Sequence, residues 1–225
     1  IQGILQDPAY IDDTIVGKIN RSLQSIAAGI RMPDGSISPP LPDLYDTGTV
    51  NSSITLPYVS LPSDYQRKVF NVYDSIFTKI SGPRGGDYYS FARFMNQINN
   101  LSLAETGEIY MVCVKGTRLY YQGIPSTSVA IGLHFYRKPL TLALDADVPE
   151  GPPEHLQLDL LTHHVLMNLF GTKVEDGQDN SGIGTKYHTA KFYENMQALC
   201  DFVGIDAEPQ YYGEGGGTDA GVCDG

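Results

Sequence analysis

Histidines are the side chains of this sequence that most often bind metal ions in proteins. His163 and His164 are adjacent in a segment with helical periodicity, so their side chains point about 100° apart and cannot both reach one ion. A site would need His155 with Asp159, four residues along, or help from the distant His188. We therefore expect structural histidines and no bound metal.

No residue pattern indicates an activated nucleophile or a phosphate site. Cys113 lies in a predicted strand and Cys200 near the end of a predicted helix, and we expect both to be small buried hydrophobic residues. With Cys223 they are too few and too scattered for a disulfide framework or a zinc site. The chain lacks a Gly-x-Ser-x-Gly turn, and its glycine-rich segments SGPRGGDYY and GEGGGTDAG lack the lysine and hydroxyl of a phosphate loop. We expect no catalysis and no cofactor.

The composition is that of a globular protein with one core. The chain has 225 residues, of which 41% are hydrophobic and 18% charged. Its net charge of -11 disfavours a broad cationic surface for nucleic acid. No stretch approaches the roughly 20 apolar residues of a membrane span, and the first residues, IQGILQDPAYIDD, carry acids where an export signal carries bases. Fifteen tyrosines without tryptophan favour protein interfaces over sugar stacking.

Hydrophobic periodicity predicts one helix near the start of the chain and two near its end. Residues 12–30 carry Ile15, Ile19, Leu23, Ile26 and Ile30 at helical spacing, with an aspartate cap at the start. The following segment RMPDGSISPPLPDLYDTG, with four prolines and two glycines, predicts a long loop with little hydrogen bonding. Leucines and Val165 mark a helix from Pro153 to Gly171, and residues 186–203 form another.

The middle of the chain, residues 49–144, changes to a period of two. Residues 69–74 and 129–136 alternate as strands do, and residues 108–114 and 119–122 flank a short glycine-containing connection that predicts a hairpin. A short helix over 91–101 follows Ser90.

These elements predict an α+β fold. The N-terminal helix (1–30) and the C-terminal helical pair (151–204) would form a helical bundle, with a loop and an inserted antiparallel β region (31–150) between them. The acidic, glycine-rich tail (205–225) has too few aliphatic residues to order itself and should be extended unless a partner holds it.

Five segments, taken in order, are similar to a known family. They are KINRSLQSIAAGI, VSLPSDYQRKVFNVYD after a threonine-rich strand, LHFYRKPLTL, DADVPEGPPEHLQLDLLTHHVLMNLF and TKYHTAKFYENMQALCDFVG. Their order and spacing over roughly residues 12 to 204 resemble the head-to-tail connector, or adaptor, proteins of tailed bacteriophages.

The resemblance implies a structural virion protein without catalysis or cofactor. It implies a ring of about twelve copies beneath the portal, in the neck that joins the DNA-filled head to the tail. The implied partners are the portal protein, tail or neck proteins and further copies of this chain, with DNA only as passing cargo and no membrane. The protein would be made in the host cytoplasm. An extended C-terminal tail would bind the portal, and its expected binding residues are Ile205, Pro209, Tyr211 and Tyr212.

Two alternatives stay open on the sequence. One is a tail-completion or other ring protein of the same virion. The other is a small hydrolase or a carbohydrate-binding module built on the β region and its tyrosines.

Overall fold

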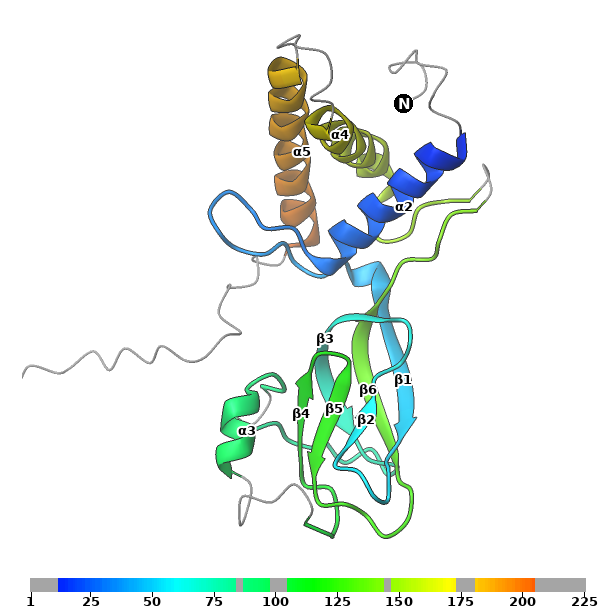
Figure 1. Cartoon of the computed structure of the whole chain (residues 1–225), viewed down its shortest axis with the longest axis vertical. Helices are drawn as coiled ribbons and strands as arrows, with labels where there is room; N and C mark the ends of the chain where they lie inside the picture. Colours follow the sequence, from blue (N-terminus) through cyan, green and yellow to red (C-terminus); the bar gives the residue numbers. More distant parts are fainter. Residues whose placement is uncertain (1–11, 84–86, 98–104, 144–146, 173–180, 205–225) are drawn as a thin grey trace, which may run out of the picture. The chain divides into compact units, whose positions relative to one another are not determined.

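A computed structural model describes residues 12–83, 87–97, 105–143, 147–172 and 181–204 (Figure 1). The chain divides into two compact units, which we call the helical unit (1–46, 64–68 and 135–208) and the strand unit (47–63, 69–134 and 209–225). The helices are α2 (Asp12–Ala28), α3 (Phe91–Gln97), α4 (Glu154–Thr172) and α5 (Ser181–Val203), with a 3-10 turn at Pro42–Leu44. The strands are β1 (Tyr45–Asn51), β2 (Tyr58–Ser60), β3 (Tyr65–Tyr73), β4 (Met111–Lys115), β5 (Arg118–Gln122) and β6 (Ala130–Arg137).

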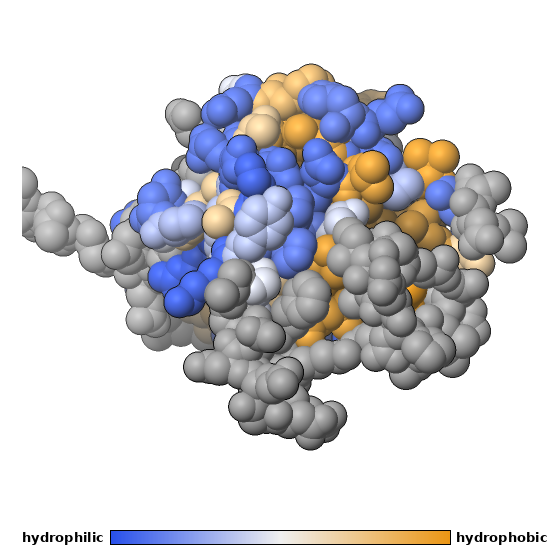
Figure 2. All heavy atoms as spheres, turned by 90° about the horizontal axis from the view of Figure 1, so that it is seen from above, coloured by the Kyte–Doolittle hydropathy of each residue, from blue (hydrophilic) through white to orange (hydrophobic). Residues whose placement is uncertain are grey.

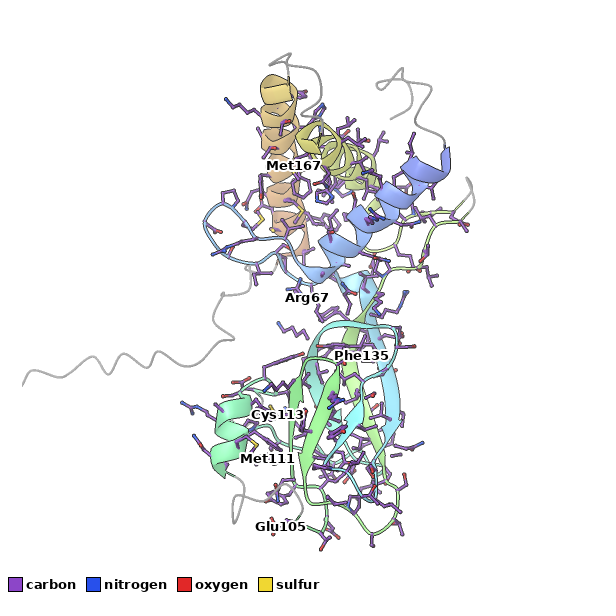
Figure 3. All side chains as sticks on the ribbon, viewed as in Figure 1. Arg67, Glu105, Met111, Cys113, Phe135 and Met167 are labelled. Atoms are coloured by element: carbon purple, nitrogen blue, oxygen red, sulfur yellow. The ribbon has the colours of Figure 1, made fainter. Side chains whose placement is uncertain are left out.

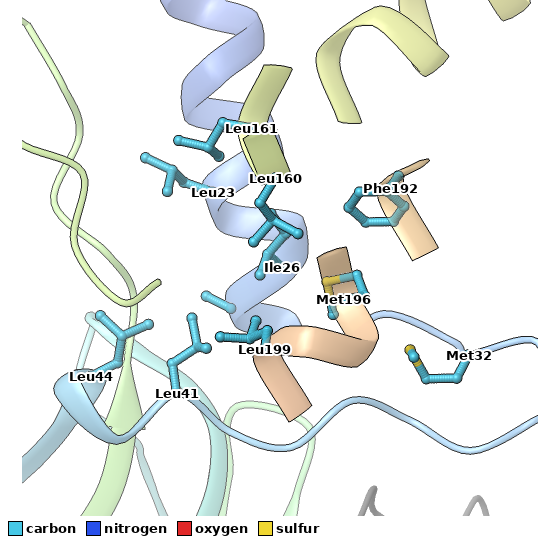
Figure 4. Close-up of a cluster of buried hydrophobic side chains, with 11 residues drawn as sticks. Leu23, Ile26, Met32, Leu41, Leu44, Leu160, Leu161, Phe192, Met196 and Leu199 are labelled. Carbon is cyan, nitrogen blue, oxygen red and sulfur yellow. The ribbon is translucent and has the colours of Figure 1, made fainter. Parts of the chain in front are cut away.

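The helical unit has a core made by helices and by loop residues together. Helix α4 packs along α5, and α2 packs on α4. Ten labelled side chains of this core are drawn in Figure 4: Leu23, Ile26, Met32, Leu41, Leu44, Leu160, Leu161, Phe192, Met196 and Leu199. Three of them, Met32, Leu41 and Leu44, belong to the connection after α2. Burial of these apolar side chains is the main force that holds the helices together.

The connection after α2 is more ordered than its prolines suggest, so the expectation of little hydrogen bonding is wrong. The backbone N–H of Ser38 donates to the carbonyl of Ile30 (2.8 Å), and the N–H of Met32 donates to the carbonyl of Ser36 (2.8 Å). Asp34 closes the turn between them, because its Oδ1 accepts from the N–H and the hydroxyl of Ser36. Pro33 lies in the turn of this small hairpin, between Met32 and Ser36, and the other three prolines follow the hairpin. The ladder therefore needs no N–H from a proline.

The segment after β6 is fixed to the helical unit by polar contacts. Arg137 binds the Glu150 carboxylate with both terminal nitrogens (2.8 and 3.3 Å), and the same carboxylate accepts from the N–H of Leu140 (3.0 Å). The Asn20 amide on α2 pairs with the backbone of Leu142, donating at 2.9 Å and accepting at 2.8 Å. This segment has no hydrophobic periodicity in the sequence, but in the structure its backbone has defined hydrogen-bond partners.

The strands form two three-stranded sheets, with strand orders β1-β6-β3 and β2-β5-β4, and most of their residues belong to the strand unit. Strand β5 pairs antiparallel with both neighbours, and Tyr120 stands opposite Tyr58 on β2 and Cys113 on β4. Helix α3 packs on β4, where Met111 and Cys113 contact Phe94 (Figure 3). The β4–β5 hairpin and strand β6 confirm the predicted hairpin and strand.

The predicted helical bundle is wrong. The structure is mixed α and β: the strands form two antiparallel sheets with buried residues of their own, such as Val112, Tyr121 and Leu133. The long helices α2, α4 and α5 lie toward the ends of the chain, and the short α3 lies between β3 and β4. A period of 3.6 residues shows that a helix buries one face but not what covers that face. Here loop residues cover part of it.

Candidate interaction surfaces

One end of the strand unit presents exposed hydrophobic side chains. Strands β1 and β3 both run antiparallel to β6, so the loops that follow them lie at the same end of the sheet. These loops expose Ile54, Leu56, Ile76 and Phe77, which we call the apolar tip; Ile76 and Phe77 are 78% and 82% exposed. Side chains of this type at such exposure are typical of a contact surface.

The conformation of the loop after β3 keeps the Phe77 side chain exposed to solvent. Asp74 Oδ1 accepts from the N–H groups of Ile76 (2.9 Å) and Thr78 (2.8 Å). Phe77 has a φ of 62°, which a bulky residue adopts only at an energetic cost, and its ring stacks on Tyr73 at 5.5 Å. Gly132 on β6 leaves the space that the Tyr73 ring fills, since an added Cβ would lie 2.0 Å from that ring.

The loop after β1 is anchored by the buried side chain of Tyr121. The Tyr121 hydroxyl accepts from the N–H of Ser53 (2.7 Å) and can donate to the carbonyl of Leu56 (2.8 Å). Ser53 Oγ in turn accepts from the N–H groups of Thr55 and Leu56. Both loops of the apolar tip are therefore fixed by hydrogen bonds.

A second surface of the strand unit combines aromatic rings with cations. We call it the basic–aromatic strip; it comprises Tyr58, Phe91, Lys115, Arg118 and Tyr120. Lys115 Nζ lies 4.2 Å from the centre of the Phe91 ring, and Arg118 Cζ lies 4.4 Å from that of Tyr58. Tyr120 links the two rings, with centroid distances of 5.1 Å to Phe91 and 5.4 Å to Tyr58. The sheet register brings these residues together, because they come from β2, β5, β4 and α3.

A surface of the helical unit combines exposed hydrophobic residues with carboxylates. We call it the acidic–apolar face; it comprises Glu154, His155, Leu158, Asp159, Asp201 and Phe202. Leu158 on α4 and Phe202 on α5 are 76% and 61% exposed. The His155 ring contacts the Phe202 ring edge-on at 5.0 Å, so the end of α5 meets the start of α4 here. On the side of the molecule that Figure 2 shows, hydrophobic side chains also lie at the surface beside hydrophilic ones.

The histidines meet in a way that their spacing did not indicate. His163 on α4 and His188 on α5 place their Nδ1 atoms 2.8 Å apart, so one ring must donate and the other accept. The neighbouring His164 is buried against Phe192, with ring centres 4.6 Å apart. Among the residues that the structure describes, no group of three or more His, Cys, Asp or Glu side chains could hold a metal ion.

These histidines make the helical unit sensitive to acid. Burial lowers the pKa of His164, and burial together with the nearby His163 lowers the pKa of His188. The folded protein therefore binds these protons less readily than the unfolded chain. The stability that the neutral rings contribute is complete above the ordinary histidine pKa of about 6.5 and is lost as the pH falls through it toward the folded values.

We predict that the melting temperature of the wild-type protein falls as the pH is lowered from about 7.5 to 5.5, across the ordinary pKa of histidine. A variant with His164→Leu and His188→Gln should lose part of this fall, because it lacks both titrating rings. Thermal unfolding followed by circular dichroism across the pH series measures it. Parallel curves for the two proteins would contradict the assignment.

Burial raises the thiol pKa of both described cysteines, Cys113 and the partly buried Cys200. Cys113 is fully buried on β4, and burial raises its pKa to about 12, so the thiol stays protonated. Cys223 lies outside the described residues, as do the predicted portal-binding residues Ile205, Pro209, Tyr211 and Tyr212. The described helices include none long and apolar enough to span a membrane.

Comparison with known proteins identifies the family of this chain. A family model described as SU10 adaptor protein matches residues 1–215, and no curated protein matches the chain. The match confirms the resemblance to bacteriophage adaptors that the order of segments indicated. Because it covers nearly the whole sequence, the chain belongs to the SU10 adaptor protein family, whose members are structural adaptor proteins of bacteriophages.

Proposed function

We propose that this chain forms a ring of about twelve copies beneath the portal, in the virion neck, where it joins the DNA-filled head to the tail. The family match over residues 1–215 carries this proposal. An adaptor needs several separate contact surfaces, and the described residues offer three: the apolar tip, the basic–aromatic strip and the acidic–apolar face. Its role needs no catalysis and no cofactor.

The charge of the chain is compatible with DNA as passing cargo. The net charge of -11 repels a phosphate backbone, so DNA could move past such a ring without binding tightly. A closed ring also multiplies weak contacts between copies, so no single side chain has to contribute a large share of the binding energy.

We propose that the tail, residues 205–225, binds the portal protein through Ile205, Pro209, Tyr211 and Tyr212. Tyrosine suits this role because it offers a large apolar ring with a polar hydroxyl and loses little conformational entropy on binding. The tail has few other aliphatic side chains that could anchor an extended segment.

Deletion of residues 205–225 should abolish binding to the purified portal protein, while the far-ultraviolet circular dichroism of the described fold is kept. Tyr211→Ala with Tyr212→Ala should weaken binding by at least about tenfold, the loss expected when two buried aromatic anchors are truncated. Asp219→Asn with Asp224→Asn is the matched control and should bind as wild type does. Surface plasmon resonance on immobilised portal measures all four proteins. Normal binding by the deleted chain would refute the tail-docking proposal.

The position in the neck is tested separately by electron microscopy of the assembled virion. A ring of this chain in contact with the portal supports the proposal. A ring found only at the far end of the tail would instead indicate a tail-completion protein.

A further inference from the structure

We propose that the basic–aromatic strip of one copy docks on the acidic–apolar face of a second copy, and that this contact joins neighbours in the ring. The inference rests on the proposed ring and names the surfaces that close it. It concerns the contact between two copies, and each of the two surfaces is described within its own unit.

The first observation is the uneven distribution of charge along the chain. Residues 47–63 and 69–134, the strand unit without its tail segment, hold five basic and four acidic residues, a net charge of +1. The whole chain has a net charge of -11, so all its other residues together have a net charge of -12. Two copies that approach through their acidic parts repel each other, whereas an approach of the strand unit to the helical unit avoids this repulsion.

The second observation is the pair of cations in the strip. Lys115 and Arg118 stand directly opposite each other in the β4–β5 register, a position in which like charges destabilise a sheet. Among the described residues neither cation forms an ion pair; each lies over an aromatic ring instead. The hairpin therefore holds two positive charges side by side, with aromatic area next to them, available to an acidic and apolar partner.

The third observation is the matching chemistry of the acidic–apolar face. Leu158 and Phe202 expose hydrophobic area that a partner could bury, and the exposed residues Glu154, Asp159 and Asp201 add carboxylates from the start of α4 and the end of α5. Lys191 on α5 binds Glu194 at 2.7 Å and also interacts electrostatically with Asp159, so this face holds one cation beside its carboxylates. An apolar centre with charges around it is the usual anatomy of a protein interface.

The pairing is heterologous, because the two surfaces belong to different parts of the chain. A heterologous contact repeats from copy to copy and closes into a ring where the rotation allows it, whereas a contact of one surface with itself gives only a dimer. Each copy would have one basic–aromatic strip and one acidic–apolar face, so in a closed ring every strip would be bound to the face of a neighbouring copy.

Charge reversal with mixing tests the proposal. The first variant, Lys115→Glu with Arg118→Glu, carries two acidic surfaces, and the second, Glu154→Lys with Asp159→Lys, carries two basic ones. We expect each variant alone to lose self-association by at least about tenfold, because like charges now face each other. An equal mixture should recover it, because each surface again meets its opposite. Sedimentation velocity on the full-length chain measures the association.

The matched control is Lys79→Glu with Arg93→Glu, two reversals in the strand unit outside the strip, which should associate as wild type does. Circular dichroism establishes that each variant is folded, and recovery in the mixture can occur only if both are. Variants that associate like wild type, or a mixture that stays monomeric, overturn the docking inference and leave the ring proposal intact. A wild-type chain that stays monomeric at every concentration, alone and on the portal, overturns the ring proposal itself.

Discussion

Gly123→Ala is expected to destabilise the strand unit by at least about 3 kcal/mol, from backbone strain together with a backbone clash. Gly123 has a φ of 87°, which disfavours any side chain, and an added Cβ would lie 2.1 Å from the carbonyl oxygen of Glu108. The next residue, Ile124, exchanges backbone hydrogen bonds with Glu105 and Gly107, so the two segments cannot separate without losing them. Urea unfolding followed by tyrosine fluorescence measures the loss.

The control for Gly123 is Gly116→Ala in the β4–β5 turn. Gly116 also has a positive φ, 62°, but an added Cβ there meets no atom within 4 Å. This variant should lose only about 1 kcal/mol, the cost of the left-handed conformation alone. Equal losses for the two variants would show that the contact with Glu108 contributes nothing.

Phe192→Ala should destabilise the helical unit by about 3 to 5 kcal/mol, the usual cost of removing a large ring from a closely packed core. Phe192 is 1% exposed, and its ring packs on His164 and on the core between α4 and α5. The loss of α-helical circular dichroism should move to lower urea, because this core holds the helices together.

The loss at Phe192 should stay within the helical unit. The strand unit has buried residues of its own, so hydrogen exchange at the amides of β4 and β5 should increase less than exchange at the amides of α4 and α5. Phe202→Ala, on the same helix but exposed, is the control and should change the free energy of unfolding by less than about 0.5 kcal/mol. A comparable loss at both positions would contradict the packing described for Phe192.

Several elements could be located from the sequence because their patterns are local. Alternation over residues 129–136 predicted β6, and the glycine-containing connection between two apolar runs predicted the β4–β5 hairpin. Helical spacing located α4 and α5, although α5 begins at Ser181, before the predicted start at Lys186. A side-chain period is set by the geometry of the element itself, so it can be read without knowledge of its neighbours.

The family could also be recognised from the sequence, because the resemblance depends on the order and spacing of segments along the chain. The proposed portal-binding residues, Ile205, Pro209, Tyr211 and Tyr212, stay a prediction of the sequence alone. The net charge of each segment can likewise be counted from its residues, although the bounds of the strand unit come from the structure.

Tertiary structure alone decided what covers each hydrophobic face and which side chains meet. The helical bundle was wrong because the strands form two sheets with buried residues of their own. In addition, Met32, Leu41 and Leu44, residues of a proline-rich connection, fill part of the core beside the helices. The pairing of His163 with His188 and the strip of Lys115 and Arg118 over aromatic rings depend on packing between distant segments. Periodicity is a property of one segment, whereas a contact depends on the relative position of two, and only the folded chain sets that position.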